Sequence, residues 1–139
     1  MTTKLIVNRA DIVQAKIVER DAVPLEDGQI RVATRRFALT ANNISYALSG
    51  EAIGYWRFFP DAQDGWGCVP VWGFGDVVES RADGVAIGDC HWGFFPMASD
   101  LVMAPSRITA NGVVDGADHR RDLPYIYNQY VRTNDDPAP

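Results

Sequence analysis

The feature of this 139-residue chain that most limits its fold is a series of short alternating segments that end at glycine or proline. Residues 12–20 and 29–39 change between apolar and polar at every second position, which is the period of a half-buried strand. The segment 24–28, PLEDG, separates them as a turn cluster. In the first segment the largely apolar set, which we expect to form the inner face, is Val13, Ala15, Ile17 and Glu19.

Further strands are expected over residues 69–80, 89–95, 99–104 and part of 108–114. Residues 40–50 combine cap-forming residues with a closing glycine, which predicts a short helical turn. The aromatic-rich segment 54–67 reads as a loop, and 122–132 as helical or irregular. Many short strands with glycine-rich turns are typical of a barrel or a sandwich. We therefore expect a mainly all-β, partly open barrel with one or two short helices.

Two W-G-F triplets, residues 72–74 and 92–94, repeat within this pattern. On neighbouring strands each triplet would place its Trp and Phe on one face. The simplest interpretation is a shared core layer, because Trp and Phe are common core residues. Glycines within a strand also mark a bulge, a bend or a close backbone approach.

Charge and cysteine content exclude several classes of protein. The formal net charge is −5, and between residues 58 and 106 Arg81 is the only basic residue against seven acidic ones. This pattern argues against nucleic-acid binding. No stretch approaches the ~20 apolar residues of a membrane helix, and no secretory segment is visible. Two cysteines, Cys68 and Cys90, fit a reducing compartment, so we expect a cytoplasmic protein.

The order of four motifs resembles a known family. TANNISYALSG, VPVWGFGDVVES, GVAIGD and MASDLVMAP follow one another in the chain. This order is similar to the GroES-like N-terminal domain of the medium-chain dehydrogenase/reductase superfamily, and its zinc-free quinone oxidoreductase branch looks most similar. FALTANNISYA, GYWRFFP, VPVWGF, FPMAS and YNQYVRT together resemble an uncharacterised bacterial family of such proteins.

The resemblance implies a barrel domain over residues 1–133, with 134–139 as a tail or the start of a linker. Members of that superfamily continue into a Rossmann domain that holds most of the nicotinamide cofactor. Here no G-x-G-x-x-G motif follows a strand. We therefore expect no cofactor in this chain alone, and NADPH if a Rossmann domain completes it. The chain would be a truncated piece or a natural stand-alone remnant.

No metal site is expected. The possible ligands Cys68, Cys90, His91 and His119 form no C-x-x-C or H-E-x-x-H motif. In the resemblance, Ala41 and Trp72 stand where zinc-dependent members carry ligands, and neither side chain binds zinc.

The resemblance points to a polar turn and an aromatic loop as the site. It implies catalytic roles for Asn42, Asn43 and Tyr46, where amides would polarise a carbonyl and a phenol would donate a hydrogen bond. Helix capping and core packing are the alternative interpretations. Substrate-binding roles are expected for Tyr55, Trp56, Phe59 and Trp72, because aromatic walls suit a flat apolar substrate. The alternatives here are a satellite core or a patch that faces a partner.

Two charged features have simpler interpretations. Asp76 lies in an apolar strand and needs a partner if buried, for which Arg35 or Arg36 is available. The pair Arg120–Arg121 reads as solvated surface.

The sequence thus predicts the substrate-side half of a zinc-independent, NADPH-dependent reductase of quinones, enones or carbonyls, inactive without its Rossmann domain. The alternative is a non-catalytic barrel module that binds a hydrophobic ligand or a protein partner, or that self-associates as a homo-oligomer. Whether the chain is an enzyme stays open at this point, because the fold alone does not fix the function.

Overall fold

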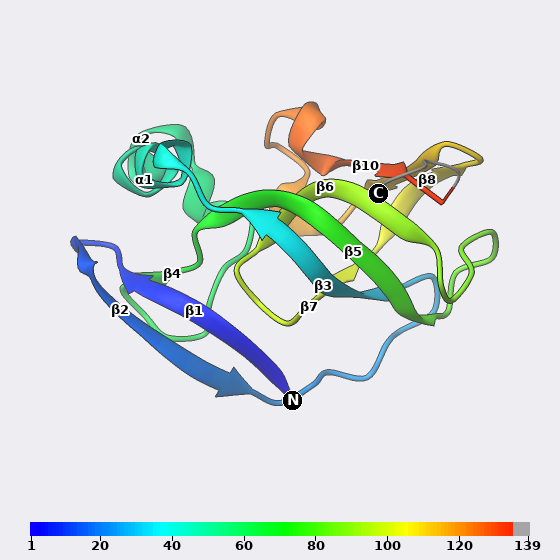
Figure 1. Cartoon of the computed structure of the whole chain (residues 1–139), viewed down its shortest axis with the longest axis horizontal. Helices are drawn as coiled ribbons and strands as arrows, with labels where there is room; N and C mark the ends of the chain where they lie inside the picture. Colours follow the sequence, from blue (N-terminus) through cyan, green and yellow to red (C-terminus); the bar gives the residue numbers. More distant parts are fainter. Residues whose placement is uncertain (135–139) are drawn as a thin grey trace.

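The computed structural model describes residues 1–134 and contains two antiparallel sheets (Figure 1). The small sheet has the order β2-β1-β4, with β1 (Thr2–Asn8), β2 (Asp11–Arg20) and β4 (Trp66–Gly67). The large sheet has the order β7-β3-β5-β6-β10-β9-β8. Its strands are β3 (Ile30–Ala38), β5 (Pro70–Ser80), β6 (Cys90–Pro96), β7 (Asp100–Met103), β8 (Pro105–Thr109), β9 (Gly112–Asp115) and β10 (Gln129–Arg132). The large sheet curls into a half-barrel, so the prediction of a mainly all-β, partly open barrel is confirmed.

The helices are short and lie between strands. They are α1 (Ala41–Leu48), α2 (Gly50–Ile53) and the 3-10 turns η1 (Tyr55–Arg57), η2 (Asp118–Arg120) and η3 (Tyr125–Asn128). The helical turn predicted over 40–50 is present, and α1 and α2 lie together beyond the end of β3 (Figure 1). In the described residues no helix has the length and apolar character to cross a membrane.

Three segments differ in detail from their predictions. The predicted loop 54–67 opens with η1 and ends in β4. The expected single strand within 108–114 is a hairpin of β8 and β9, because Ala110 and Asn111 make a turn that pairs Thr109 with Gly112. Residues 122–132 contain η3 and then β10, since Val131 and its neighbours pair with both β6 and β9.

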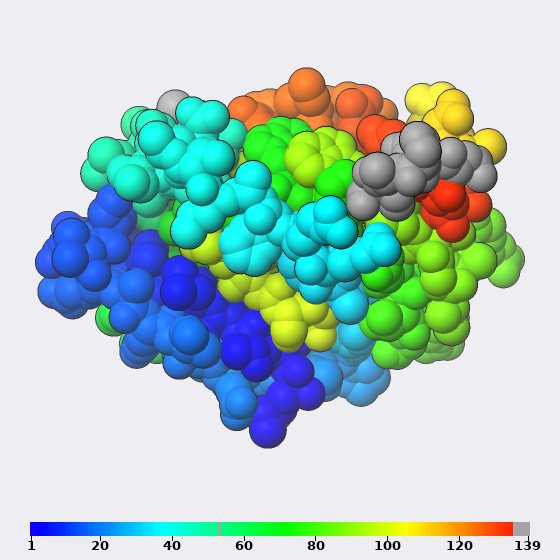
Figure 2. Space-filling view, viewed as in Figure 1, coloured from blue at the N-terminus to red at the C-terminus, as the bar shows by residue number. Residues whose placement is uncertain are grey.

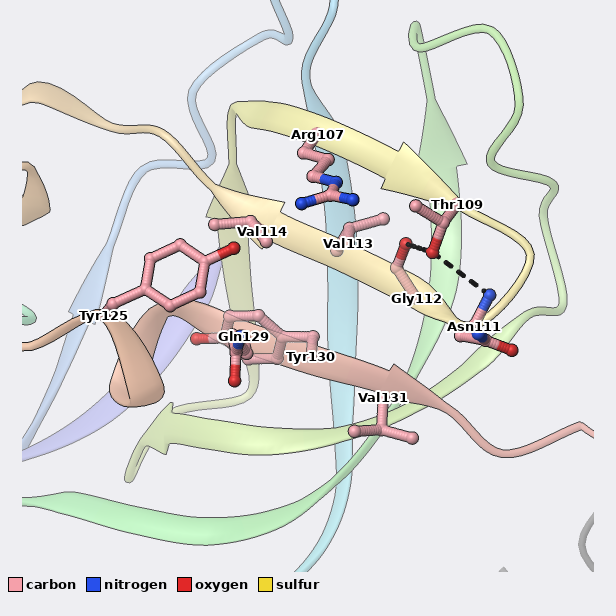
Figure 3. Close-up of a pocket in the computed structure, with 10 residues that line it drawn as sticks. All are labelled: Arg107, Thr109, Asn111, Gly112, Val113, Val114, Tyr125, Gln129, Tyr130 and Val131. Atoms are coloured by element: carbon pink, nitrogen blue, oxygen red, sulfur yellow. Dashed lines mark hydrogen bonds between the residues drawn. The ribbon is translucent and has the colours of Figure 1, made fainter.

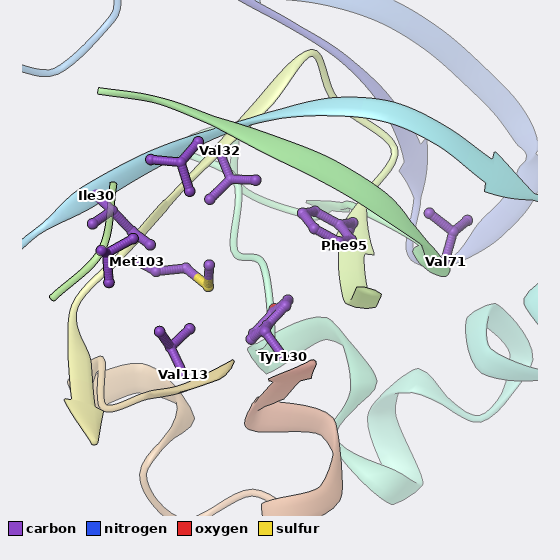
Figure 4. Close-up of a cluster of buried hydrophobic side chains, with 9 residues drawn as sticks. Ile30, Val32, Val71, Phe95, Met103, Val113 and Tyr130 are labelled. Atoms are coloured by element: carbon purple, nitrogen blue, oxygen red, sulfur yellow. The ribbon is translucent and has the colours of Figure 1, made fainter. Parts of the chain in front are cut away.

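The main core fills the inside of the curled sheet. Figure 4 shows side chains from β3, β5, β6 and the C-terminal strands converging there. The cluster comprises Ile30, Val32, Val71, Val77, Val85, Phe95, Met103, Val113 and Tyr130. The Tyr130 ring packs against Gly93 of β6. A Cβ atom at Gly93 would lie 2.4 Å from ring carbon Cδ1, so a larger residue there would clash with the ring.

The apolar set predicted for the inner face of β2 is exposed, and that prediction was wrong. Val13 and Ile17 are 88% and 70% exposed. Ile17 is paired with Leu5 of β1, so the two side chains point to the same face. However, β2 is an edge strand of the small sheet, and Ile17 borders an open cleft beside Phe37 and Leu39 instead of a packed core.

The two sheets join along β1. The Leu5 N–H donates to the Met97 carbonyl at 2.9 Å, and the Ser99 N–H donates to the Thr3 carbonyl at 2.7 Å. Thr2 Oγ1 also donates to Asp100 Oδ1 at 2.8 Å. One edge of β1 therefore contacts the β6–β7 connection, while its other edge holds β2.

The predicted boundary between the domain and its tail falls at residue 134, which is the last residue that the structure describes. Asn134 is ordered against β6, where its Oδ1 accepts the Cys90 N–H at 2.8 Å. The rest of the predicted tail, 135–139, lies outside the described residues.

Candidate functional site

The two W-G-F triplets meet on neighbouring strands. As predicted, they lie side by side in the sheet, with Trp72 of β5 opposite Phe94 of β6 and Phe74 opposite Trp92. Trp72, Phe74 and Trp92 are half-buried on the outer face of the sheet, and we name these three side chains the aromatic shelf. The Trp72 and Trp92 rings stack at 6.1 Å between centroids with planes 19° apart. Figure 2 shows side chains of β5 and β6, in green and lime, at the surface between α1 and the C-terminal segments.

A buried aromatic cluster supports the shelf from beneath. It comprises Tyr55, Phe58, Phe59, Cys68, Phe94 and Leu123. Tyr127 of η3 packs against Phe94 with ring centroids 4.7 Å apart, and it also contacts Trp72. The shelf is therefore the exposed margin of a second core on the outer face of the sheet.

Three of the four predicted substrate-binding residues lie inside cores. Tyr55 and Phe59 belong to the aromatic cluster, and Trp56 packs with Val7 and Val69 in a third cluster. Their exposed fractions are 8%, 5% and 4%, in the order Tyr55, Phe59, Trp56. Trp72 is the one member of the predicted set that presents ring surface to solvent beside α1. The role predicted for the buried three stays a prediction. In the structure they pack in cores, and Phe59 also borders a hollow of about 420 Å³ beside Lys4 and His119.

Helix α1 places Tyr46 at the edge of the shelf. The Tyr46 hydroxyl accepts a hydrogen bond from Trp72 Nε1 at 3.3 Å, and its ring lies 4.6 Å from that of Tyr55. Since the hydroxyl is the acceptor here, its own proton is left for another partner. Asn42 lies one turn earlier on the same helix face and is exposed. The phenol and this amide thus border the same surface.

Both the oxygen and the nitrogen of the Asn43 side-chain amide form hydrogen bonds to the backbone. Its Oδ1 accepts the Thr40 N–H at 2.6 Å, and its Nδ2 donates to the Pro70 carbonyl at 3.0 Å. The side chain is buried. Asn43 therefore fixes the start of α1 against the first residue of β5, two positions before Trp72. The capping alternative describes what this side chain does in the structure.

Tyr55 does not supply an acid near neutral pH. Burial, together with the hydroxyl of Tyr127 at 3.3 Å, raises the pKa of Tyr55 to about 12. Its phenol stays protonated over the whole physiological range.

A charged group ends the shelf on the side away from α1. Arg35 Nη1 lies 3.6 Å from Asp76 Oδ1 and donates to Cys90 Sγ at 3.4 Å. The predicted pairing of Asp76 with Arg35 is confirmed. However, both side chains are about two-fifths exposed, so this is a surface pair and not a buried one.

Arg120 was predicted to be solvated, and this prediction was wrong. Its side chain is fully buried. Nη1 donates to Asp115 Oδ2 at 2.9 Å and to the Tyr130 hydroxyl at 2.8 Å, while Nε donates to Asn128 Oδ1 at 2.8 Å. The neighbouring Arg121 is exposed, as expected for the pair. The sequence gives no local signal here, because the partners come from β9, η3 and β10.

The histidines are held separately. His91 is buried, and this burial lowers its pKa. His119 Nε2 lies 3.1 Å from the Phe58 carbonyl oxygen. Across residues 1–134 no three His, Cys, Asp or Glu side chains come together in a way that could hold a metal ion.

Among the described residues, two of the hollows apart from the shelf are lined largely by apolar side chains. One, of about 340 Å³, lies over β8, β9 and β10 beside Tyr125 and Arg107 (Figure 3). The second, of about 400 Å³, lies between the small sheet and the end of β3, and we name it the apolar cleft. Its lining includes Leu5, Phe37, Leu39 and Met97.

Sequence reasoning missed Phe74, Trp92 and Tyr127 as members of the candidate site. The repeated triplet was a usable signal for the first two, because a period of two places Trp and Phe on one face. Tyr127 comes from a 3-10 turn that lies far away in the sequence, and nothing in the local pattern indicates it.

Comparisons with known proteins add a family and a fold. The family model described as "Protein of unknown function (DUF2855)" matches residues 37–139. A search of curated proteins finds no match. Among solved structures, the chain is similar to CurA from Vibrio vulnificus, with a TM-score of 0.56 and 6% sequence identity over 79% of this chain. The likeness covers 34% of CurA, so the chain spans about a third of that protein's length. At this identity the likeness concerns the fold alone.

Proposed function

The chain belongs to the DUF2855 family, and we propose that it serves as the substrate-side barrel of a zinc-independent, NADPH-dependent reductase of quinones, enones or carbonyls. The aromatic shelf is the observation that carries this proposal. Its stacked indoles offer flat, weakly polar surface that suits a flat conjugated substrate. The Tyr46 hydroxyl and the Asn42 amide at its edge supply hydrogen-bond donors for a carbonyl oxygen.

The residues present fit one part of the cofactor. The shelf suits the flat nicotinamide ring, whereas the phosphates need cations or free backbone N–H groups that the shelf residues do not offer. We therefore propose that a separate nucleotide-binding domain completes the site. NADPH, when bound, would supply a hydride to the substrate.

The chain's own residues would hold and polarise the substrate. Trp72 and Trp92 would contact one face of the substrate and exclude water from that side. The Tyr46 hydroxyl, held by Trp72 Nε1 at 3.3 Å, has a proton free to donate to the oxygen on which negative charge develops. Asn42 would donate a second hydrogen bond to that oxygen. Asn43 would act through α1, because it fixes the helix that carries both donors.

Binding of a flat quinone tests the proposal. The full chain is titrated with 1,4-naphthoquinone while tryptophan fluorescence is recorded. We expect saturable quenching that Trp72→Leu or Trp92→Leu weakens by about tenfold, because each variant removes a stacking face. Trp66→Leu is the matched control, since Trp66 is also half-buried but lies on β4 of the other sheet.

Several outcomes decide the matter. Absence of quenching, or quenching that Trp72→Leu leaves unchanged, would refute the shelf as a substrate site. A parallel NADPH titration of the same chain addresses the cofactor. Saturable micromolar binding would show that this chain holds a nucleotide site of its own, which would contradict the need for a separate nucleotide-binding domain.

The apolar cleft favours a second candidate function, a non-catalytic barrel that binds a hydrophobic ligand. Leu39 at its rim is 68% exposed, which is unusual for leucine beside other apolar groups. A dodecanol titration followed by calorimetry tests it. Binding that Leu39→Lys abolishes, together with no quinone binding, would favour this candidate over the reductase.

We also propose that the protein works in a reducing compartment, the cytoplasm. Cys68 and Cys90 are both free and buried. Thiols of this kind need no oxidising environment to support the fold.

A further inference from the structure

We propose that β2 is a self-complementary edge, through which two copies of this chain pair to form one continuous six-stranded sheet. The inference is independent of the reductase proposal, because β2 contributes no residue to the aromatic shelf. It rests on three observations about β2: its free backbone edge, its exposed apolar side chains and its palindromic sequence pattern.

The hydrogen bonds of β1 define which backbone groups of β2 are free. The Leu5 N–H and the Thr3 carbonyl both bond to the β6–β7 connection, on the side of β1 away from β2. Backbone groups alternate in direction along a strand, so Lys4 and Ile6 face β2 and pair with Val18 and Lys16. The N–H and C=O groups of the intervening residues of β2 must therefore point outward. Those residues are Ala15, Ile17 and Glu19.

Such an edge normally carries protection along its whole length, whereas on β2 it is concentrated towards the two ends of the strand. Natural proteins blunt exposed edges by keeping them short, or with proline, bulges or several charges. β2 is ten residues long and contains no proline. Three of its four charged residues, Asp11, Glu19 and Arg20, lie at its ends, and its register against β1 shifts between Ala15 and Asp11. Within the described residues it pairs with β1 alone. Val13 and Ile17, on the same side as Ala15, expose 88% and 70% of their surface.

The sequence of β2 reads similarly in both directions about Ala15. Residues 12–18 are Ile-Val-Gln-Ala-Lys-Ile-Val, a pattern of two apolar, one polar, one small, one polar and two apolar residues. Antiparallel pairing around a two-fold axis at Ala15 places Val13 opposite the partner's Ile17. Ala15 then lies opposite the partner's Ala15, and the outward N–H and C=O groups of this central pair bond to each other. Every apolar side chain of the segment gains an apolar partner.

Other symmetric registers fit less well. The axis must pass through a residue, because only then do side chains on the same face meet. An axis at Lys16 places two ammonium groups against each other, and one at Gln14 places Asp11 opposite the partner's Ile17. A hetero-partner would not require a palindrome at all, so the pattern favours a second copy.

The pairing should be weak and salt-dependent. A single pair of strands buries less than the roughly 1,200–2,000 Å² of a standard interface. In the Ala15-centred register, Asp11 lies opposite the partner's Glu19 at both ends, and like charges opposed in this way are unfavourable. Screening by added salt should therefore strengthen the dimer.

Sedimentation equilibrium of the full chain over a concentration series tests the proposal. We expect a monomer–dimer equilibrium that Ile17→Lys weakens by about tenfold or more, since it removes two symmetric Val–Ile pairs. Ile87→Lys is the matched control, because Ile87 is also 70% exposed but lies in the turn before β6. It should leave the dissociation constant unchanged.

Two further variants separate the register from general stickiness. Glu19→Lys turns the repulsive end pairs into attractive ones and should tighten the dimer by about threefold or more. Ala15→Pro removes an N–H that points outward, so circular dichroism should report a folded chain that no longer dimerises. A wild-type chain that stays monomeric at all concentrations, or a dimer that survives both Ile17→Lys and Ala15→Pro, would overturn the proposal.

Discussion

Arg120 is a fully buried cation, so other buried groups must neutralise its charge. Asp115, its ion-pair partner, is as fully buried, and removal of one member leaves the other without compensation. We expect Arg120→Met to lower the free energy of unfolding by about 3–5 kcal/mol in urea titrations. Arg121→Met, the adjacent control, removes an exposed pair with Asp118 and should change it by less than about 0.5 kcal/mol. Equal effects from the two variants would contradict the buried network.

Asp61 makes the stability of the molecule depend on acid. Burial of this carboxyl opposes its ionisation, but hydrogen bonds from Arg20, the Gln63 N–H and Lys4 outweigh that and lower its pKa to about 2. A lowered folded-state pKa stabilises the fold above the unfolded pKa, and the contribution is lost as pH falls from about 4 towards 2. Between about pH 4 and pH 2, the unfolding free energy of Asp61→Asn should therefore fall by about 1–2 kcal/mol less than that of the wild type.

Asp64→Asn provides the comparison for that acid titration. Asp64 is exposed and lies three residues further along the same segment. If urea unfolding at pH 2 to 5 gives the same slope for Asp61→Asn as for wild type, the assignment to Asp61 is wrong.

β5 can pair closely with β3 only because Gly73 has no side chain. A Cβ atom there would lie 2.3 Å from the Arg36 carbonyl oxygen, next to the irregular register between Thr34 and Arg36. A backbone oxygen in a sheet cannot move aside easily, so Gly73→Ala should cost about 1–3 kcal/mol in thermal unfolding. Gly28→Asn is the control, because Gly28 has open space around it and asparagine tolerates its positive φ. An unaltered melting temperature for Gly73→Ala would show that the two strands can separate at this point.

The sequence predicts elements well where the pattern is local. The alternation over 29–39, the turn after Pro24 and the placing of Trp and Phe on one face within each W-G-F triplet all depend on residues close to one another in the chain. Burial of β2 could not be predicted, because it depends on whether the other sheet extends that far. The hairpin of β8 and β9 was missed for a similar reason, since its strands are too short to show a period.

The same limit applies to the candidate site. Trp72 and Tyr46 could be selected from sequence, and the structure brings them within hydrogen-bond distance. Tyr55, Trp56 and Phe59 have the same aromatic chemistry, but they point into cores, and residue type does not distinguish the two cases. Arg120 illustrates the reverse, because its partners Asp115 and Asn128 become neighbours only through the C-terminal turns.

For the whole molecule, the two sheets divide the chain into unequal parts joined along one strand. The small sheet contacts the rest mainly through β1 and the cluster around Trp56, whereas the large sheet encloses its own core. Local opening should therefore begin with the small sheet, where fewer buried contacts oppose it.

The stacked pair Trp72–Trp92 gives the molecule a built-in optical signal. Two indoles 6.1 Å apart couple their excited states, and such a pair produces a bisignate band in circular dichroism that neither ring gives alone. Trp56 and Trp66 are placed elsewhere and do not share it. The chirality of this one contact thus reports whether the outer face of β5 and β6 keeps its native arrangement, and no label has to be attached to the chain.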